Sequence, residues 1–182
     1  RAPAAPAPSA SYDEGRAYDE GLSPGVQVDG GRYIVERHLG TGGMGAVYLA
    51  NDARLNRPVA IKLMKRELIG HPTARTRMER EAQALANINH PNVIDIYNVL
   101  DHAGTVALVL EYVGGGTLTD RLARGALPWS DATTLLTGVL DGLQVLHNQG
   151  LVHRDLKPDN VLVDARSNTP KITDLGVAHV QA

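Results

Sequence analysis

Residues 153–160 read HRDLKPDN and residues 174–176 read DLG. The first stretch contains, in order, a carboxylate (Asp155), an amine (Lys157) and an amide (Asn160), and the second begins with another carboxylate. A carboxylate can orient a hydroxyl group and accept its proton, an ammonium can stabilise a phosphate, and an amide with a carboxylate can hold magnesium. The combination and its order therefore favour a chemical site over a polar surface loop.

Upstream, residues 40–47 read GTGGMGAV. The glycines lie between two predicted strands, residues 33–39 and 46–50, whereas a dinucleotide-binding fingerprint would open a helix after one strand. This position favours backbone amides that cover the phosphates of a mononucleotide. The glycines concerned are Gly40, Gly42, Gly43 and Gly45.

A lysine, Lys62, ends the tetrapeptide VAIK on a third predicted strand, residues 59–64. An isolated lysine on a strand is usually a solvated edge charge. The charged amphipathic stretch that follows, residues 71–88, predicts a helix with Glu81 on its apolar face. Glu81 can therefore hold the Lys62 ammonium toward a phosphate. Glu79 is the competing partner, but its helical phase puts it off that face.

The downstream pattern predicts two further strands, a glycine joint, a long helix and two short closing strands. Ser130 or Asp131 can cap the long helix, which carries apolar residues at helical spacing and ends at Gly150. This order predicts an α+β fold with an antiparallel β-rich lobe and one main helix, a hinge, and the beginning of an α-rich lobe. The ranges are 93–99 and 106–112 for strands, 114–116 for the joint, and 161–163 and 171–174 for the closing strands.

The stretches GTGGMGAVYLA, RPVAIK and HRDLKPDN together resemble the protein kinase superfamily, and most of all the eukaryotic-like serine/threonine kinases of bacteria. The resemblance runs from about Arg32 to the end of the chain. It implies a protein-kinase-like fold, with the N-lobe and hinge at residues 32–113 and a partial C-lobe at residues 114–182. It also implies phosphoryl transfer from ATP to serine or threonine hydroxyls of proteins, because Lys157 follows Asp155 by two residues.

The resemblance assigns a role to each charged residue of the motifs. Asp155 would be the catalytic base, and Lys157 would stabilise the γ-phosphate. Asn160 and Asp174 would hold Mg²⁺. The two other expected catalytic residues are Lys62, for the α- and β-phosphates of ATP, and its partner Glu81.

The same resemblance implies the surroundings of the adenine. Side chains above and below would sandwich the ring, one would act as gatekeeper, and backbone groups of the hinge would bond its edge. Ordinary core packing is compatible with the same apolar residues. They are Leu39, Val47, Ala60 and Leu162 for the sandwich, Leu118 for its support, Leu110 as gatekeeper, and Glu111 and Val113 for the backbone bonds.

Two features depart from the family's pattern. Leu175 stands where phenylalanine is usual, and we expect it to complete a packed column with His153, Leu85 and Ile96. After Gly176 only six residues remain, so we expect a fragment of a longer product that is marginally stable and inactive alone. A non-catalytic ATP-binding or scaffold module, and a small-molecule phosphotransferase, remain alternatives.

The composition bounds the class of protein. A chain of 182 residues predicts one principal domain, and a net charge of −2 gives no reason to expect nucleic acid or an anionic membrane as the main partner. Cysteine is absent, which fits a reducing compartment, and we expect a cytoplasmic protein. No apolar run approaches the roughly 20 residues of a membrane span, although a longer product could carry an anchor.

The first residues differ from the rest of the chain. Residues 1–31 are rich in Ala, Pro and Gly, and we expect a disordered tail. The tetrapeptide YDEG begins at Tyr12 and again at Tyr18. A solvated spacer is the favoured interpretation, and a docking or phosphorylation segment is the alternative.

Overall fold

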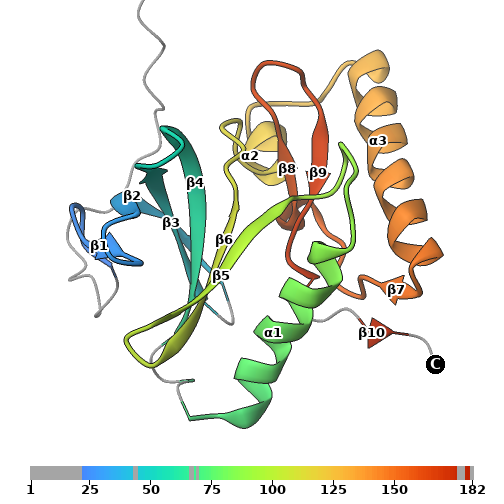
Figure 1. Ribbon diagram of the computed structural model, residues 1–182. Coiled ribbons are helices and arrows are strands. Elements are labelled where there is room, and N and C mark those ends of the chain that lie inside the picture. The colour runs from blue at the N-terminus through green and yellow to red at the C-terminus, as the bar shows by residue number, and fades with distance from the viewer. Residues whose placement is uncertain (1–21, 43–44, 66–67, 69, 176–178, 181–182) are drawn as a thin grey trace, which may run out of the picture.

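The computed structural model describes residues 22–42, 45–65, 68, 70–175 and 179–180. Within them, six strands form one antiparallel sheet in the order β1-β2-β3-β4-β6-β5, on the left of Figure 1. The strands are β1 (Gln27–Val28), β2 (Tyr33–Thr41), β3 (Gly45–Asp52), β4 (Arg57–Met64), β5 (Ile96–His102) and β6 (Thr105–Glu111).

The central strand β4 separates two apolar clusters. Ala60 and Met64 belong to the cluster that also contains the main helix. Val59 and Ile61 belong to the cluster on the opposite face of the sheet, the outer cluster. Successive side chains of a strand point to opposite faces. Lys62 therefore leaves the sheet on the same face as Ala60 and Met64, toward the second half of the molecule.

The first strand corrects the predicted extent of the tail. A disordered segment up to residue 31 is wrong for residues 22–31, because β1 pairs with β2 and Val28 is buried in the outer cluster. Leu22 and Val26 also pack against that cluster. These apolar residues gain burial only when β2 lies beside them, which composition alone does not indicate. Residues 1–21, with both YDEG repeats, lie outside the described residues.

The main helix α1 (Pro72–Ala86) agrees with the prediction to within two residues at its end. Proline at the start of a helix leaves no additional donor unsatisfied. Ala74, Met78, Ala82 and Leu85 are buried at spacings of four and three, which defines one face of the helix. That face joins the cluster formed by β4, β6 and the second half of the chain.

The second half contains helices and two small two-stranded sheets, on the right of Figure 1. β8 pairs with β9, and β7 pairs with β10. The observed architecture confirms the α+β, kinase-like fold with an antiparallel first lobe and one main helix. The elements are α2 (Leu118–Ala123), α3 (Trp129–Asn148), β7 (Leu151–Val152), a 3-10 helix (Pro158–Asn160), β8 (Val161–Val163), β9 (Pro170–Ile172) and β10 (His179–Val180).

Several predicted boundaries are wrong by a few residues, and the structure shows the cause for three of them. β5 does not start at residue 93, because Val93 forms an isolated parallel bridge with Ile172 of β9. Helix α3 starts at Trp129 after Pro128, and neither serine nor aspartate caps it. β9 ends at Ile172 because Thr173 donates its backbone N–H to the carbonyl of Asn160 instead.

Helix α3 buries only part of its apolar surface. Leu135, Val139 and Leu146 are buried against the rest of the molecule. In contrast, Leu136 and Leu140 are 60% and 63% exposed. The helix therefore has a second apolar face that no described residue covers. None of the described helices is long and apolar enough to cross a membrane.

The glycine joint is tied to β8. The N–H of Val163 donates to the carbonyl of Gly116 at 2.9 Å, and Thr117 forms a bridge with Leu162. A Cβ atom on Gly115 would collide with the carbonyl oxygen of Val163. The chain can pass this close to β8 only because residue 115 has no side chain.

Replacing Gly115 by alanine should lower the free energy of unfolding by about 1–3 kcal/mol, the range for overpacking a close contact. The control is Gly114→Ala, whose added Cβ would make an ordinary contact 3.6 Å from the Tyr112 ring. That variant should be neutral or slightly more stable. Urea denaturation of both variants tests this pair, and equal losses of stability would contradict the close approach.

Candidate active site

Three elements bring charged side chains together at one point. Nζ of Lys62, from β4, donates to Oε1 and Oε2 of Glu81 on α1 at 3.0 and 2.8 Å. The same atom donates to Oδ1 of Asp174, just after β9, at 2.9 Å. Lys62 thus connects the sheet, the main helix and the second half of the molecule.

The charges of this group depend on one another. Burial alone would lower the pKa of Lys62, but the carboxylates of Glu81 and Asp174 outweigh burial and raise it. Lys62 is therefore an ammonium at neutral pH. Burial also raises the pKa of Glu81, which is 1% exposed, and the Lys62 ammonium opposes that rise. Lys62 thus favours the ionised form of Glu81, whereas burial favours the protonated form.

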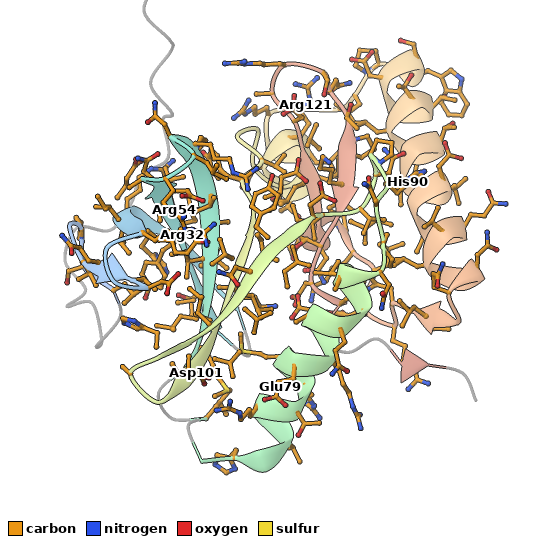
Figure 2. The ribbon with its side chains drawn as sticks, in the orientation of Figure 1. Arg32, Arg54, Glu79, His90, Asp101 and Arg121 are labelled. Carbon is orange, nitrogen blue, oxygen red and sulfur yellow. The ribbon has the colours of Figure 1, made fainter. Side chains whose placement is uncertain are left out.

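The competing carboxylate, Glu79, lies elsewhere. Figure 2 shows it on α1, with Asp101 of β5 nearby at the outer end of the sheet. Arg75 links the two, with contacts of 2.8 Å to Glu79 and 3.1 Å to Asp101. The structure therefore pairs Lys62 with Glu81 and not with Glu79.

The stretch 153–160 folds into a loop with internal contacts. Nζ of Lys157 lies 3.0 Å from Oδ2 of Asp155. Nδ2 of Asn160 donates to the backbone carbonyl of Asp155 at 2.8 Å and to its Oδ2 at 3.2 Å. The hydrogen bond from Lys157 lowers the pKa of Asp155, so this carboxyl is ionised at neutral pH. The predicted base, ammonium and amide are thus brought together.

His153 anchors this loop to β9. Its Nε2 donates to the carbonyl of Thr173 at 2.8 Å, and its Nδ1 accepts the N–H of Asp155 at 3.3 Å. This pattern places the proton on Nε2. His153 is buried, as are Leu85 and Leu175 of the predicted column. A packed structural role for the histidine fits these contacts.

Two residues of the site have left-handed backbone. Arg154 has φ of 64° and Asp174 has φ of 65°. Residues with side chains rarely adopt this conformation, and it is enriched at functional sites where the surrounding structure holds it. No sequence signal predicted either angle.

Asn160 and Asp174 lie at the same end of the β8–β9 hairpin. Val161 pairs with Ile172, and Thr173 donates its N–H to the carbonyl of Asn160 at 3.0 Å. Asn160 uses Nδ2 for its side-chain hydrogen bonds, which leaves its Oδ1 oxygen for a cation. Asparagine and aspartate oxygens are the donors that Mg²⁺ prefers.

The number of protein ligands also bears on the metal. Over the described part of the chain, no group of three or more His, Cys, Asp or Glu side chains could hold a metal alone. Magnesium commonly binds through one or two protein groups, with phosphate oxygens and water completing its octahedron. The residues present therefore fit a magnesium ion that arrives with a phosphate.

The predicted adenine residues are only partly brought together. Ala60, Leu110 and Val113 are buried in the cluster between the sheet and α1, and Ala60 pairs with Leu110 across β4 and β6. Half-buried side chains pack against the same cluster, namely Val47, Leu118 and Leu162. Leu39 is half-buried but belongs to neither apolar cluster of the described residues.

The glycine segment is the turn between β2 and β3. Gly40 pairs with Val47, and the N–H of Gly42 donates to the carbonyl of Gly45 at 2.8 Å. A Cβ atom on Gly45 would collide with the carbonyl oxygen of Leu63. Gly43 lies outside the described residues.

The side chain of Glu111 has a contact that sequence reasoning missed. Its Oε2 lies 3.0 Å from Nζ of Lys171 on β9 and accepts the N–H of Asp95 at 3.3 Å. The prediction gave Glu111 only a backbone role and did not single out Lys171. The two are 60 positions apart in the sequence, and no local pattern links them.

A surface hollow of about 620 Å³ lies away from these residues. It is between the first half of α3 and the turn that joins β8 to β9, with Trp129 and Asp141 among its lining residues. No predicted site residue lines it.

Comparison with known proteins identifies the family. The protein kinase domain model matches residues 33–182. Serine/threonine-protein kinase pkn2 of Myxococcus xanthus is 38% identical over 161 residues, covering 87% of this chain and 19% of that protein. Serine/threonine-protein kinase PrkC of Bacillus subtilis is 38% identical over 149 residues, covering 81% of this chain and 23% of that protein.

A relative from a plant matches over the same region. CBL-interacting serine/threonine-protein kinase 21 of Arabidopsis thaliana is 35% identical over 150 residues, covering 82% of this chain and 36% of that protein. The chain thus spans between about a fifth and a third of the length of these curated relatives. The family model covers most of the chain, and the relatives are named as serine/threonine kinases. The chain belongs to the protein kinase domain family.

Proposed function

We propose that this chain carries the nucleotide-binding centre of a serine/threonine protein kinase, which transfers the γ-phosphoryl group of ATP to a hydroxyl of a protein substrate. The observation that carries the proposal is the contact of the Lys62 ammonium with both Glu81 and Asp174. It places a cation from the first lobe directly beside a carboxylate of the second. A triphosphate with its metal needs both kinds of group.

Lys62 is the proposed contact of the α- and β-phosphates. Glu81 fixes the ammonium in place, since its two oxygens accept hydrogen bonds from the same Nζ. When a nucleotide binds, its phosphate oxygens would take the position next to Nζ that Asp174 now occupies. Asp174 would then be free to bind the metal.

Asp155 is the proposed catalytic base. Its carboxylate would accept the proton of the substrate hydroxyl as the bond between that oxygen and the γ-phosphorus forms and the bond to ADP breaks. The lowered pKa of Asp155 keeps it ionised for this step. Lys157, 3.0 Å away, would stabilise the charge on the transferred phosphoryl group.

Membership of the family implies ATP and a divalent metal, and we propose Mg²⁺ held by Asn160 and Asp174. The metal would neutralise charge on the phosphates. The proposed phosphate cover is formed by Gly40, Gly42, Gly43 and Gly45. The proposed adenine contacts are Leu39, Val47, Ala60, Leu110, Leu162 and the backbone of Glu111 and Val113.

We propose that residues 32–113 form the N-lobe and hinge and that residues 114–182 form the partial C-lobe. The proposed partners are ATP and a protein with a serine or threonine acceptor. We also propose a cytoplasmic location for this centre, since a sequence without cysteine fits a reducing compartment.

Nucleotide binding by this chain tests the proposal. Saturating Mg-ATP, at about 100 times its dissociation constant, should stabilise the chain by about 2.7 kcal/mol. Lys62→Met should abolish that stabilisation, measured against the variant's own melting temperature without nucleotide. Lys65→Met, which removes a lysine just beyond the same strand, is the matched control and should keep it.

The metal is tested separately with Asp174→Asn. In the unchanged chain, ATP should bind more tightly with Mg²⁺ than with EDTA, and this difference should disappear in the variant. Equal Mg-ATP stabilisation of the unchanged chain and of Lys62→Met would contradict the proposed phosphate site. If a longer protein that contains this chain bound Mg-ATP but transferred no phosphoryl group to a protein substrate, the non-catalytic alternative would be favoured.

A further inference from the structure

His38 and Thr41 contact each other at the base of the glycine segment. Nε2 of His38 lies 2.9 Å from the hydroxyl oxygen of Thr41. Both belong to β2, and residues three apart in a regular strand point to opposite faces of the sheet. A side-chain hydrogen bond between them therefore requires an irregular strand.

The irregularity is a bulge at Leu39. His38 pairs with Tyr48, whereas Gly40 pairs with Val47, so two steps along β2 match one step along β3. The extra residue shifts the alternation of side chains by one position. Thr41, like His38, therefore lies on the same face of the sheet as Tyr48. The hydrogen bond spans the bulge and joins the residues on either side of it.

This contact lies on the outer face of the sheet. The His38 ring meets the Tyr48 ring edge to face, with centroids 5.3 Å apart, and Tyr48 belongs to the outer cluster. Val47 packs against the opposite cluster, which contains Ala60 and Leu110. His38 and Thr41 are therefore behind the proposed nucleotide position and would not touch the nucleotide.

We propose that His38 and Thr41 form a latch that fixes the bulge and thereby sets the path of the backbone at Gly40 and Gly42, where the glycine segment would cover the phosphates of ATP. The inference rests on the proposed function of the glycine segment. Gly40 is flanked directly by the bulge, and Gly42 follows Thr41 and donates its N–H to the carbonyl of Gly45, so the position of this turn depends on the conformation of residues 38–41. Either His38 donates to the hydroxyl or the hydroxyl donates to Nε2, and both arrangements fix the bulge.

The latch should matter for the phosphates and not for the base. Thr41→Val keeps the shape of the side chain but removes the hydroxyl, and it should weaken ATP binding about three- to tenfold, the range for one lost hydrogen bond. Adenosine binding should change by less than about twofold. Thr41→Ser retains the hydroxyl and should restore the affinity for ATP.

His38→Phe completes the test because it keeps an aromatic ring against Tyr48 without a hydrogen-bonding nitrogen. It should weaken ATP binding to the same extent as Thr41→Val, and the double variant should be no weaker than either single one. His102→Phe, a histidine at the far end of the same sheet, is the control and should leave ATP binding unchanged.

The measurements are dissociation constants for ATP and adenosine by titration calorimetry on the full chain. Unchanged ATP affinity in Thr41→Val and His38→Phe would overturn the latch and leave the proposed function intact. Equal weakening of ATP and adenosine would also overturn it, because the effect would then be general strand packing. If the unchanged chain binds no ATP, the proposed function fails and the latch fails with it.

Discussion

Lys62→Met should lower the free energy of unfolding by about 3–5 kcal/mol, the cost of breaking a buried ion pair on one side. The variant leaves Glu81 almost inaccessible to water without the ammonium that donates two hydrogen bonds to it. Asp174 is on the solvent side of the group and loses less. Equilibrium urea denaturation measures the difference.

The loss should increase with pH. Burial raises the pKa of Glu81, and removing Lys62 removes the charge that opposed the rise. A group with a raised folded-state pKa contributes stability below its unfolded-state pKa and loses it as pH rises through the folded-state value. The variant should therefore be closest to the unchanged chain at acid pH, where Glu81 is protonated in both the folded and the unfolded state, and furthest from it at neutral pH.

A double variant separates the ion pair from other effects of the substitution. Lys62→Met with Glu81→Leu replaces both charges by apolar side chains, which often restores stability at a buried pair. It should be more stable than Lys62→Met alone, and its difference from the unchanged chain should vary less with pH than that of Lys62→Met. Additive losses, or a pH-independent loss in Lys62→Met, would contradict the pairing.

Arg75→Met is the matched control for this experiment. Arg75 pairs with Glu79 through a contact of 2.8 Å, as short as the contact of Lys62 with Glu81. Both side chains of the control pair are in solvent, where an ion pair contributes little to stability. The free energy of unfolding of this variant should therefore equal that of the unchanged chain. Burial, and not contact distance, would then explain the loss of stability in Lys62→Met.

The Lys62–Glu81 pair was predictable because each half has a local pattern. Alternation along β4 sets the direction of Lys62, and helical spacing puts Glu81 on the apolar face of α1. The β8–β9 hairpin likewise follows from two short apolar runs, and it brings Asn160 near Asp174. Local periodicity is sufficient wherever it decides which face a side chain occupies.

Features that depend on partners distant in the sequence were not predictable. The strand β1 has only two residues and exists because β2 lies beside it. The bulge at Leu39 appears only in the register between β2 and β3. The ion pair of Glu111 with Lys171 needs the hinge and β9 to meet. No repeat or residue spacing within a single segment indicates any of these three features.

The exposed apolar face of helix α3 should determine whether the chain associates with itself. Trp129, Leu136 and Leu140 are 86%, 60% and 63% exposed, and the two leucines are one turn apart on one face. Exposed apolar patches of this kind favour association of protein molecules. The purified 182-residue chain should therefore self-associate at micromolar concentrations, and Leu136→Glu with Leu140→Glu should convert it to a monomer.

The control adds the same charge on a different helix. Thr73→Glu with Gln83→Glu places two negative charges at exposed positions of α1. Glutamate is a good helix former, so neither pair of substitutions should unfold its helix. Sedimentation velocity should therefore find the leucine variant monomeric and the α1 variant as associated as the unchanged chain. If the α1 variant became monomeric too, net charge would be the cause, and the apolar face would have no special role.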